Sequence, residues 1–250
     1  MHTLENQPVL ITGGSRGLGL GLAEALVERK ARVTVLARDR AALLEAKRRL
    51  GVDVIAGDAT DPELARSVLR ELHPAVVVLN AGVVPAMAPL HEQTWEGFSG
   101  AWNNDVKAGF HWIQAALQLP LAPGSRVLVG SSGAAIAGSP LSGGYAGAKR
   151  MLWLMAGYAN GVSAELGLGI RFQALLPRQI IAETQLGRAA AEAYARRKGV
   201  TLEDFLAGFG KPMPPRQYGA HVVSILTDPA HASATAFALR GDTGIQALDA

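Results

Sequence analysis

Short, uniformly apolar segments recur along the chain and alternate with longer segments that have helical spacing. The apolar segments lie near residue 10 and at 32–37, 52–57, 75–80, 126–131, 170–176 and 234–239. Because they are apolar throughout, they predict strands buried on both faces of a sheet. Helices are predicted at 17–29, 40–49, 61–72, 95–118 and 144–167, with others after residue 185. This alternation predicts an α/β fold, a doubly wound sheet of parallel strands with helices on both faces.

The whole chain, residues 1–250, is expected to form one domain, because no internal repeat, low-complexity tract or linker divides it. Residues 178–215 follow the sixth predicted strand, at the edge where open α/β sheets bind ligands. This irregular segment is predicted to be a substrate lid. The alternative is a small helical decoration with no role.

Composition narrows the classes of function. Hydrophobic residues make up 49% of the chain, enough for a sizeable core, whereas charged residues make up only 18%. The net charge of +3 comes from 24 Lys and Arg against 21 Asp and Glu, which is a small surplus and not a basic stripe. The sequence therefore predicts no nucleic-acid partner.

Several kinds of site are excluded or unsupported by residue usage. The sequence contains no cysteine, which excludes disulfides, thiolate metal sites and cysteine nucleophiles. No His, Asp and Glu cluster has metal-ligand spacing, so no catalytic metal is predicted. The N-terminal residues show no signal core, and no run reaches the roughly 18 apolar residues that span a bilayer. A cytoplasmic protein without membrane association is expected.

A glycine-rich segment, TGGSRGLG at residues 12–19, follows the first predicted strand and leads into a helix. Gly13, Gly17 and Gly19 allow a sharp turn and a close approach of the backbone to a pyrophosphate. The free amides and the positive dipole end of the following helix would bind that anion. The segment therefore predicts a nucleotide site, although glycines also serve tight packing between a strand and a helix.

The residues after the second strand bear on cofactor choice. A dinucleotide fold that prefers NAD usually carries an acid here for the ribose 2′-hydroxyl, whereas NADP needs cationic groups for the 2′-phosphate. This chain has Ala37 followed by Arg38, whose guanidinium suits a phosphate, and Arg16 could close on it from the other side. NADP(H) is therefore predicted over NAD(H). In the alternative, both arginines are solvated or Asp39 neutralises Arg38.

The segment GSSGAAIAGSPLSGGYAGAKR, residues 130–150, carries the candidate chemistry. Tyr145 and Lys149 are one helical turn apart and would face one cleft. A phenol is a poor acid or base at neutral pH, but a nearby ammonium stabilises the phenolate and allows proton exchange with a substrate oxygen. Ser132 would orient that oxygen. In the alternative, Tyr145 is a packed aromatic and Lys149 a solvated charge.

Taken in order, these motifs resemble the short-chain dehydrogenase/reductase family. TGGSRGLG matches the family's TGxxxGxG, Asp58 takes the place of the acid that meets adenine, and residues 80–82 form its NAG motif. Ser132, Tyr145 and Lys149 match its S-x12-Y-x3-K pattern. The resemblance implies a seven-stranded parallel Rossmann sheet and hydride transfer with a nicotinamide cofactor. It implies cofactor contacts from Gly13, Ser15, Arg16, Gly17, Leu18, Gly19, Arg38, Asp58, Ala59, Asn80, Ala81, Gly82, Tyr145, Lys149 and Pro177.

Two positions depart from the family pattern. Asp105 stands where family members usually carry a catalytic asparagine, so it joins Ser132, Tyr145 and Lys149 as a candidate catalytic residue, with proton relay in doubt. Arg178 replaces a glycine after the sixth strand, and Thr184 comes two positions later than the family's threonine. Because an arginine cannot copy a positive-φ glycine without strain, the loop is expected to follow another path. Arg178 would face either an anionic substrate or solvent.

The sequence therefore predicts an NADP(H)-dependent carbonyl reductase or alcohol dehydrogenase with Tyr145 as general acid/base. The alternative is a weakly active or non-catalytic NADP(H)-binding regulator or scaffold. A small-molecule carbonyl or alcohol is the expected substrate. The family resemblance also implies a homodimer or homotetramer, since relatives commonly pair their fourth and fifth long helices.

Overall fold

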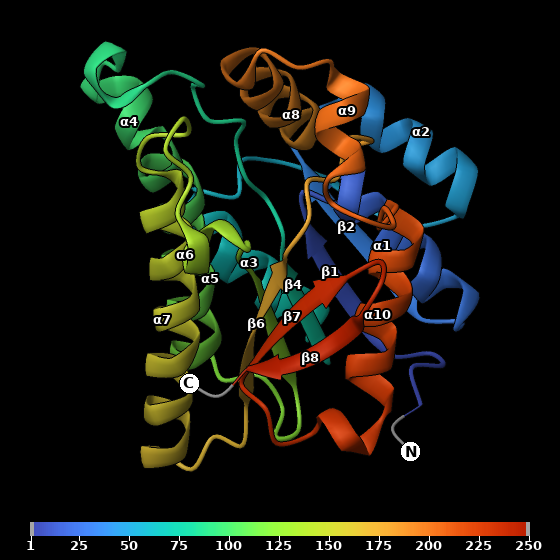
Figure 1. Cartoon of the computed structure of the whole chain (residues 1–250). Coiled ribbons are helices and arrows are strands. Elements are labelled where there is room, and N and C mark those ends of the chain that lie inside the picture. The colour runs from blue at the N-terminus through green and yellow to red at the C-terminus, as the bar shows by residue number, and fades with distance from the viewer. Residues whose placement is uncertain (1–2, 249–250) are drawn as a thin grey trace.

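The computed structural model describes residues 3–248 as an eight-stranded sheet with helices on both faces (Figure 1). The strands are β1 (Pro8–Thr12), β2 (Arg32–Ala37), β3 (Asp53–Ala56), β4 (Val76–Leu79), β5 (Arg126–Gly130), β6 (Arg171–Pro177), β7 (Ala236–Arg240) and β8 (Gly244–Leu248). Their order is β3-β2-β1-β4-β5-β6-β7-β8, and every pair is parallel except β7 with β8. The predicted doubly wound α/β fold is confirmed.

Helices cover the two faces and complete two separate cores. They are α1 (Gly17–Glu28), α2 (Arg40–Leu50), α3 (Pro62–Leu72), α4 (Trp95–Ala101), α5 (Lys107–Gln118), α6 (Ala134–Ala137), α7 (Tyr145–Glu165), α8 (Gln185–Lys198), α9 (Leu202–Ala207) and α10 (Pro215–Thr227). Leu26 of α1 and Val222 of α10 belong to one core, whereas Leu69, Trp112 and Leu152 from α3, α5 and α7 belong to the other. Burial of strands from both sides explains their uniformly apolar sequences.

One strand was not predicted. β8 (Gly244–Leu248) runs antiparallel to β7 after a tight turn that contains Asp242, and Gly244 has φ +74°. The segment GIQAL is only partly buried, so it lacks the continuous apolar pattern that identified the other strands. The seven predicted parallel strands are present, and β8 extends the sheet by one edge strand.

The long helix predicted over residues 95–118 is interrupted. A π-helical turn, η2 (Trp102–Val106), lies between α4 and α5. Hydrophobic spacing does not reveal such a turn, because the interruption lasts only one turn and keeps the helix axis. Its effect is to place Asp105 in the interior, where the residue is 2% exposed.

The segment predicted as a lid is mostly helical. α8 and α9 lie above the carboxyl ends of the strands (Figure 1). Ala191, Ala195 and Phe205 form a small apolar cluster that holds the two helices together. Within residues 3–248, none of the helices has the length and apolar character that crossing a bilayer requires.

Candidate active site

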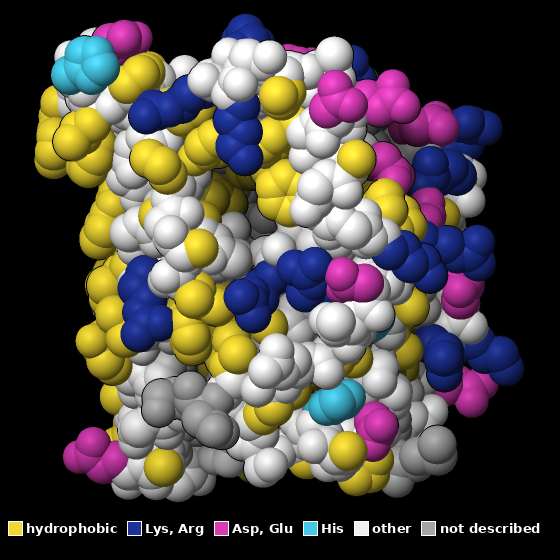
Figure 2. Space-filling model, viewed as in Figure 1, with side chains coloured by type: hydrophobic (Ala, Val, Ile, Leu, Met, Phe, Trp, Pro, Cys, Tyr) yellow, Lys and Arg dark blue, Asp and Glu magenta, His cyan; other side chains and the backbone are white. Residues whose placement is uncertain are grey.

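A cleft of about 1240 Å³ opens at the carboxyl edge of the sheet, where the strand order reverses between β1 and β4. All the predicted site residues line it except Gly19 and Asp105, which lie just behind its walls. Figure 2 shows a hollow between the α6–α7 and α8–α9 sides of the molecule, with Lys and Arg side chains along its rim. The fold thus brings residues of all the sequence motifs to one cleft.

The glycine loop after β1 is shaped for close approach of an anion. Gly13 has φ +66°, and a β-carbon there would lie 2.7 Å from the α-carbon of Ala81. Arg16, the N-cap residue of α1, makes no side-chain capping bond, so no cap side chain accepts from the first-turn amides. A helix N-terminus left open in this way fits a pyrophosphate.

The NAG motif after β4 braces this loop. The Asn80 side chain donates to the Gly13 carbonyl oxygen at 3.0 Å. The backbone amides of Asn80 and Ala81 donate to the hydroxyl of Thr12 at 3.1 and 3.2 Å. Thr12 was not among the predicted site residues, because its role depends on the adjacency of β1 and β4. It joins the ends of these two strands.

The far end of the cleft, beside β2, combines Arg38 with two acids. Asp39 accepts a hydrogen bond from the Ala42 amide at 3.0 Å and so caps α2. No ion pair joins Asp39 to Arg38 within residues 3–248. Hydrogen bonds from Thr60 lower the pKa of Asp58 against the opposing effect of burial, and the charge of Arg38 lowers it further. Arg38 therefore presents an unpaired cation to the cleft.

Ser132, Tyr145 and Lys149 all line the cleft. Tyr145 is the first residue of α7, and the Lys149 ammonium lies 5.5 Å from the centre of its ring. Ser132 follows the end of β5, and its hydroxyl accepts from the Ala134 amide at 3.2 Å. The hydroxyl of neighbouring Ser131 donates to the Lys149 carbonyl at 2.7 Å and ties α7 to β5.

Behind these residues Lys149 forms a buried ion pair with Asp105. Nζ of Lys149 lies 3.0 Å from Oδ2 of Asp105, and their side chains are 8% and 0% exposed. The other carboxylate oxygen accepts from the Val83 amide at 2.9 Å, and Nζ also donates to the Gly130 carbonyl at 3.3 Å. A β-carbon at Gly82 would lie 2.9 Å from the carboxylate, so glycine is needed for this approach.

The pair controls the charge on Lys149. Burial by itself lowers the pKa of this ammonium, but the charge of Asp105 and the nearby Tyr145 oppose it, and the net pKa lies above the ordinary value. Lys149 is therefore cationic at neutral pH, and its charge is largely balanced by Asp105. An asparagine in place of Asp105, as the family pattern has it, would leave the Lys149 charge without this balance.

Arg178 and Thr184 are the two residues of the loop after β6 whose types or places in the sequence depart from the family pattern. Arg178 is not among the residues with positive φ, so its backbone does not carry the strain that copying a positive-φ glycine would impose. Its side chain lines the cleft but remains solvent-exposed. The Thr184 hydroxyl bonds its own helix, donating to Ile181 and accepting from Gly187, while its methyl group packs against Gly17.

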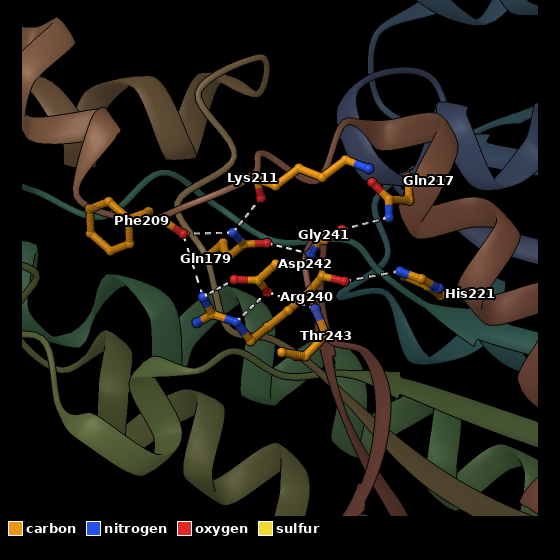
Figure 3. A network of polar contacts seen from close by, with 9 residues as sticks. All are labelled: Gln179, Phe209, Lys211, Gln217, His221, Arg240, Gly241, Asp242 and Thr243. Atoms are coloured by element: carbon orange, nitrogen blue, oxygen red, sulfur yellow. Dashed lines mark hydrogen bonds and ion pairs between the residues drawn. The ribbon is translucent and has the colours of Figure 1, made fainter.

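Two sets of contacts attach the segment of residues 178–215 to the rest of the protein. The Tyr194 hydroxyl bonds Ser139 at 2.9 Å and accepts from the Leu141 amide at 3.3 Å, which joins α8 to the loop before α7. At the other end Gln179 donates to the carbonyls of Phe209 and Lys211 at 3.0 and 2.7 Å (Figure 3). Sequence reasoning missed these residues because their partners lie 30 or more positions away. Within the described residues, no group of three or more His, Asp or Glu side chains could hold a metal ion.

Comparison with known proteins gives consistent matches. A family model described as short chain dehydrogenase matches residues 7–194. A hydroxynaphthalene reductase of Aspergillus fumigatus is 28% identical over 90% of this chain and 87% of its own length. Versicolorin reductase 1 of Aspergillus parasiticus is 31% identical over 59% of this chain and 60% of its length.

Two further matches bear on cofactor and fold. An NADPH-dependent pterin aldehyde reductase of Arabidopsis thaliana is 27% identical over 70% of this chain and 75% of its length. The structure of an NAD⁺-bound xylitol dehydrogenase superposes with a TM-score of 0.81 at 20% identity, over 94% of this chain and 97% of that one. At this identity the structural match supports the fold alone. The family match, which covers most of the chain, shows that this protein belongs to the short-chain dehydrogenase/reductase family of oxidoreductases.

Proposed function

We propose that this oxidoreductase transfers a hydride between NADP(H) and a carbonyl or alcohol, with Tyr145 as general acid/base. The observation that carries the proposal is that Tyr145, Lys149 and Ser132 line the same cleft as the open glycine loop. The nicotinamide, when bound, supplies or accepts the hydride at the substrate carbon. The residues of the chain then have to orient the substrate oxygen and move one proton.

Each catalytic side chain has a distinct task in this proposal. Ser132 holds the substrate oxygen by a hydrogen bond, and Tyr145 gives it a proton in reduction or takes one in oxidation. Lys149, whose ammonium lies 5.5 Å from the centre of the Tyr145 ring, stabilises the negative charge on the tyrosine oxygen, and as in the family it would bond the nicotinamide ribose. Asp105 acts through Lys149, because its carboxylate pairs with the ammonium and lies outside the cleft lining.

The preference for NADP(H) is supported by Arg38 and Arg16. Both line the cleft, Arg38 directly after β2 and Arg16 at the N-cap of α1, and Asp39, the neighbour of Arg38, is engaged in capping α2. A guanidinium can bind a 2′-phosphate through charge-assisted hydrogen bonds, whereas Ala37 offers no acceptor to a 2′-hydroxyl. A relative whose name specifies NADPH is consistent with this assignment. Cytoplasmic location stays a prediction, as does the role of residues 178–215 as a substrate lid.

Replacement of Tyr145 tests the enzymatic function. In Tyr145→Phe the proton donor is lost, so turnover of reducible carbonyls should fall about 10²–10⁴-fold, the usual contribution of general acid–base catalysis. NADPH binding, measured by cofactor fluorescence, should remain within about threefold because the other cofactor contacts are unchanged. If wild type and variant bind NADPH equally and neither reduces any member of a broad carbonyl panel, the regulator or scaffold alternative replaces the proposal.

Replacement of Asp105 tests the balancing of charge around Tyr145. In Asp105→Asn one negative charge leaves the buried cluster, so the cluster releases a proton more readily, whichever member provides it. Alcohol oxidation requires that released form, and the acid limb of its pH–rate profile should move to lower pH by roughly one unit, the low end of shifts caused by a neighbouring charge. Asp53→Asn on exposed β3 is the control. An unmoved acid limb with reduced rate would show a structural role only.

Replacement of Arg38 tests the cofactor preference. Arg38→Ala should weaken NADPH binding about 10–100-fold, the worth of one hydrogen bond to a charged group, and leave NADH binding nearly unchanged. Arg48→Ala removes a comparable surface arginine that pairs with Glu45 outside the cleft and serves as control. Equal weakening of both cofactors would show that Arg38 does not bind the 2′-phosphate.

The helix face proposed for pairing with a second copy carries a stripe of exposed apolar residues. Leu154, Tyr158 and Val162 follow at intervals of four along α7, Leu166 continues the interval at the C-cap, and Phe110 of neighbouring α5 is also exposed. Figure 2 shows apolar side chains along the edge where Figure 1 places α7. Contiguous apolar surface of this kind marks an interaction site.

Light scattering tests this assignment. The wild-type protein should behave as a dimer or tetramer, and Tyr158→Glu, which places a charge in the middle of the stripe, should lower the mass toward that of a single chain. Leu44→Glu changes a similarly exposed apolar residue on α2, outside the stripe, and should keep the oligomer. A wild-type monomer would contradict the proposed pairing.

A further inference from the structure

The part of the cleft formed by the lid is aromatic. Tyr194 and Phe205 lie with their rings nearly parallel, 6.2 Å between centres and 9° between planes. Phe209 meets Phe205 edge-on at 5.2 Å. All three residues line the cleft that contains Ser132 and Tyr145. This wall suits a planar, ring-sized apolar body, because aromatic faces pack well against one another.

The same cleft is lined by an arginine whose stem passes next to the residue after Ser132. Arg178 follows the last residue of β6, and its γ-carbon lies 3.4 Å from the position a β-carbon would take at Gly133. Gly133 is the residue after Ser132, so the stem of Arg178 runs beside the catalytic serine. Arg178 lines the cleft and makes no ion pair within residues 3–248.

The backbone that carries Arg178 is fixed on both sides. The Arg178 amide donates to the Leu239 carbonyl at 2.9 Å. The side chain of the next residue, Gln179, accepts from the Gly241 amide at 2.5 Å while it holds the carbonyl of Phe209 (Figure 3). The same contacts therefore position the cation and one aromatic residue of the wall. Such preorganisation lowers the entropic cost of holding a ligand.

A second cation lies on the wall. The Lys198 ammonium sits 5.3 Å from the centre of the Phe205 ring and lines the cleft. Glu183 also lines the cleft, but no ion pair joins it to Arg178 or Lys198 in the described chain. Two unpaired cations thus face the same chamber as the aromatic rings. The remaining cleft acids, Asp39 and Asp58, lie at the opposite end, beside β2 and β3.

Resting on the proposed function, we propose that the enzyme's substrates are carbonyl compounds with a planar apolar body and a carboxylate, and that Arg178 binds this carboxylate and determines the specificity. A guanidinium matches a carboxylate in a bidentate arrangement, and an aromatic wall beside it accepts the ring system that connects carboxylate and carbonyl. Lys198 adds positive potential at the rim. Because Arg178 retains solvent access, its effect is moderate, about tenfold in affinity for one charge-assisted contact.

A binding experiment tests the anion site without requiring turnover. Titration calorimetry on the NADP⁺-loaded protein compares 2-naphthoate with 2-naphthamide, which has nearly the same shape but no charge. The wild type should bind naphthoate about tenfold more tightly. Arg178→Met should remove this difference, Arg178→Lys should keep part of it, and Arg188→Gln should keep all of it. Arg188 is a lid arginine that pairs with Glu192 and does not line the cleft.

A kinetic comparison tests specificity on the same variants. With NADPH, wild type should reduce 6-formyl-2-naphthoate with about tenfold higher kcat/KM than its methyl ester. Arg178→Met should raise KM for the acid and leave kcat and the ester nearly unchanged, as expected for loss of binding common to ground and transition states.

Three results would overturn the inference. The first is equal affinity of the wild type for naphthoate and naphthamide, and the second is an equal loss of affinity for both compounds in Arg178→Met. The third is weaker NADPH binding in Arg178→Met, which would assign the arginine to the cofactor. Selective, Arg178-dependent binding of naphthoate without reduction of either aldehyde would support the anion site and count against the proposed reductase function alone.

Discussion

The buried ion pair between Lys149 and Asp105 connects the parts of the protein that make up the candidate active site. Lys149 comes from α7, Asp105 from the π-helical turn before α5, and their further hydrogen bonds reach the chain after β4 and the end of β5. Removing two charges from water is costly, and the cost is offset only when the geometry is good and the remaining donors and acceptors are satisfied. The Val83 amide bonds Oδ1 of Asp105 and the Gly130 carbonyl accepts from Lys149, while Oδ2 of Asp105 has the ammonium as its ion-pair partner but no hydrogen bond within residues 3–248.

This pair also determines the net charge beside the Tyr145 ring. A lone ammonium beside a phenol favours its ionised form, whereas an ammonium paired with a carboxylate does so less. Asp105 lies in the π-helical turn and is buried, so the carboxylate of the pair is supplied by this irregular part of the helix. Turns of this kind inside α-helices are frequently found at functional sites. The local helix geometry and the chemistry of the cleft are thus linked through one side chain.

The cleft uses different physical means along its length. At the end proposed for the pyrophosphate, the cleft is formed by the glycine loop and the open N-terminus of α1, and Asn80 and Thr12 brace them. In the middle lie Ser132, just after β5, and Tyr145 and Lys149 on α7, the residues to which the proposed chemistry is assigned. In residues 178–215, Gln179 bonds the Phe209 carbonyl and Tyr194 bonds Ser139.

The sequence by itself determined the fold class, the positions of seven strands and the motif residues that line the cleft, because uniformly apolar strands, a glycine loop and a tyrosine and lysine one turn apart are local patterns. Only the tertiary structure decided which residues far apart in the sequence contact one another. Asp105 and Lys149 form an ion pair although they are 44 positions apart in the sequence. Gln179 bonds the Phe209 carbonyl, 30 positions away, and β8 forms by pairing with the edge of β7. Such contacts join residues distant along the chain, and their geometry depends on how helices pack on the sheet, which no local pattern encodes.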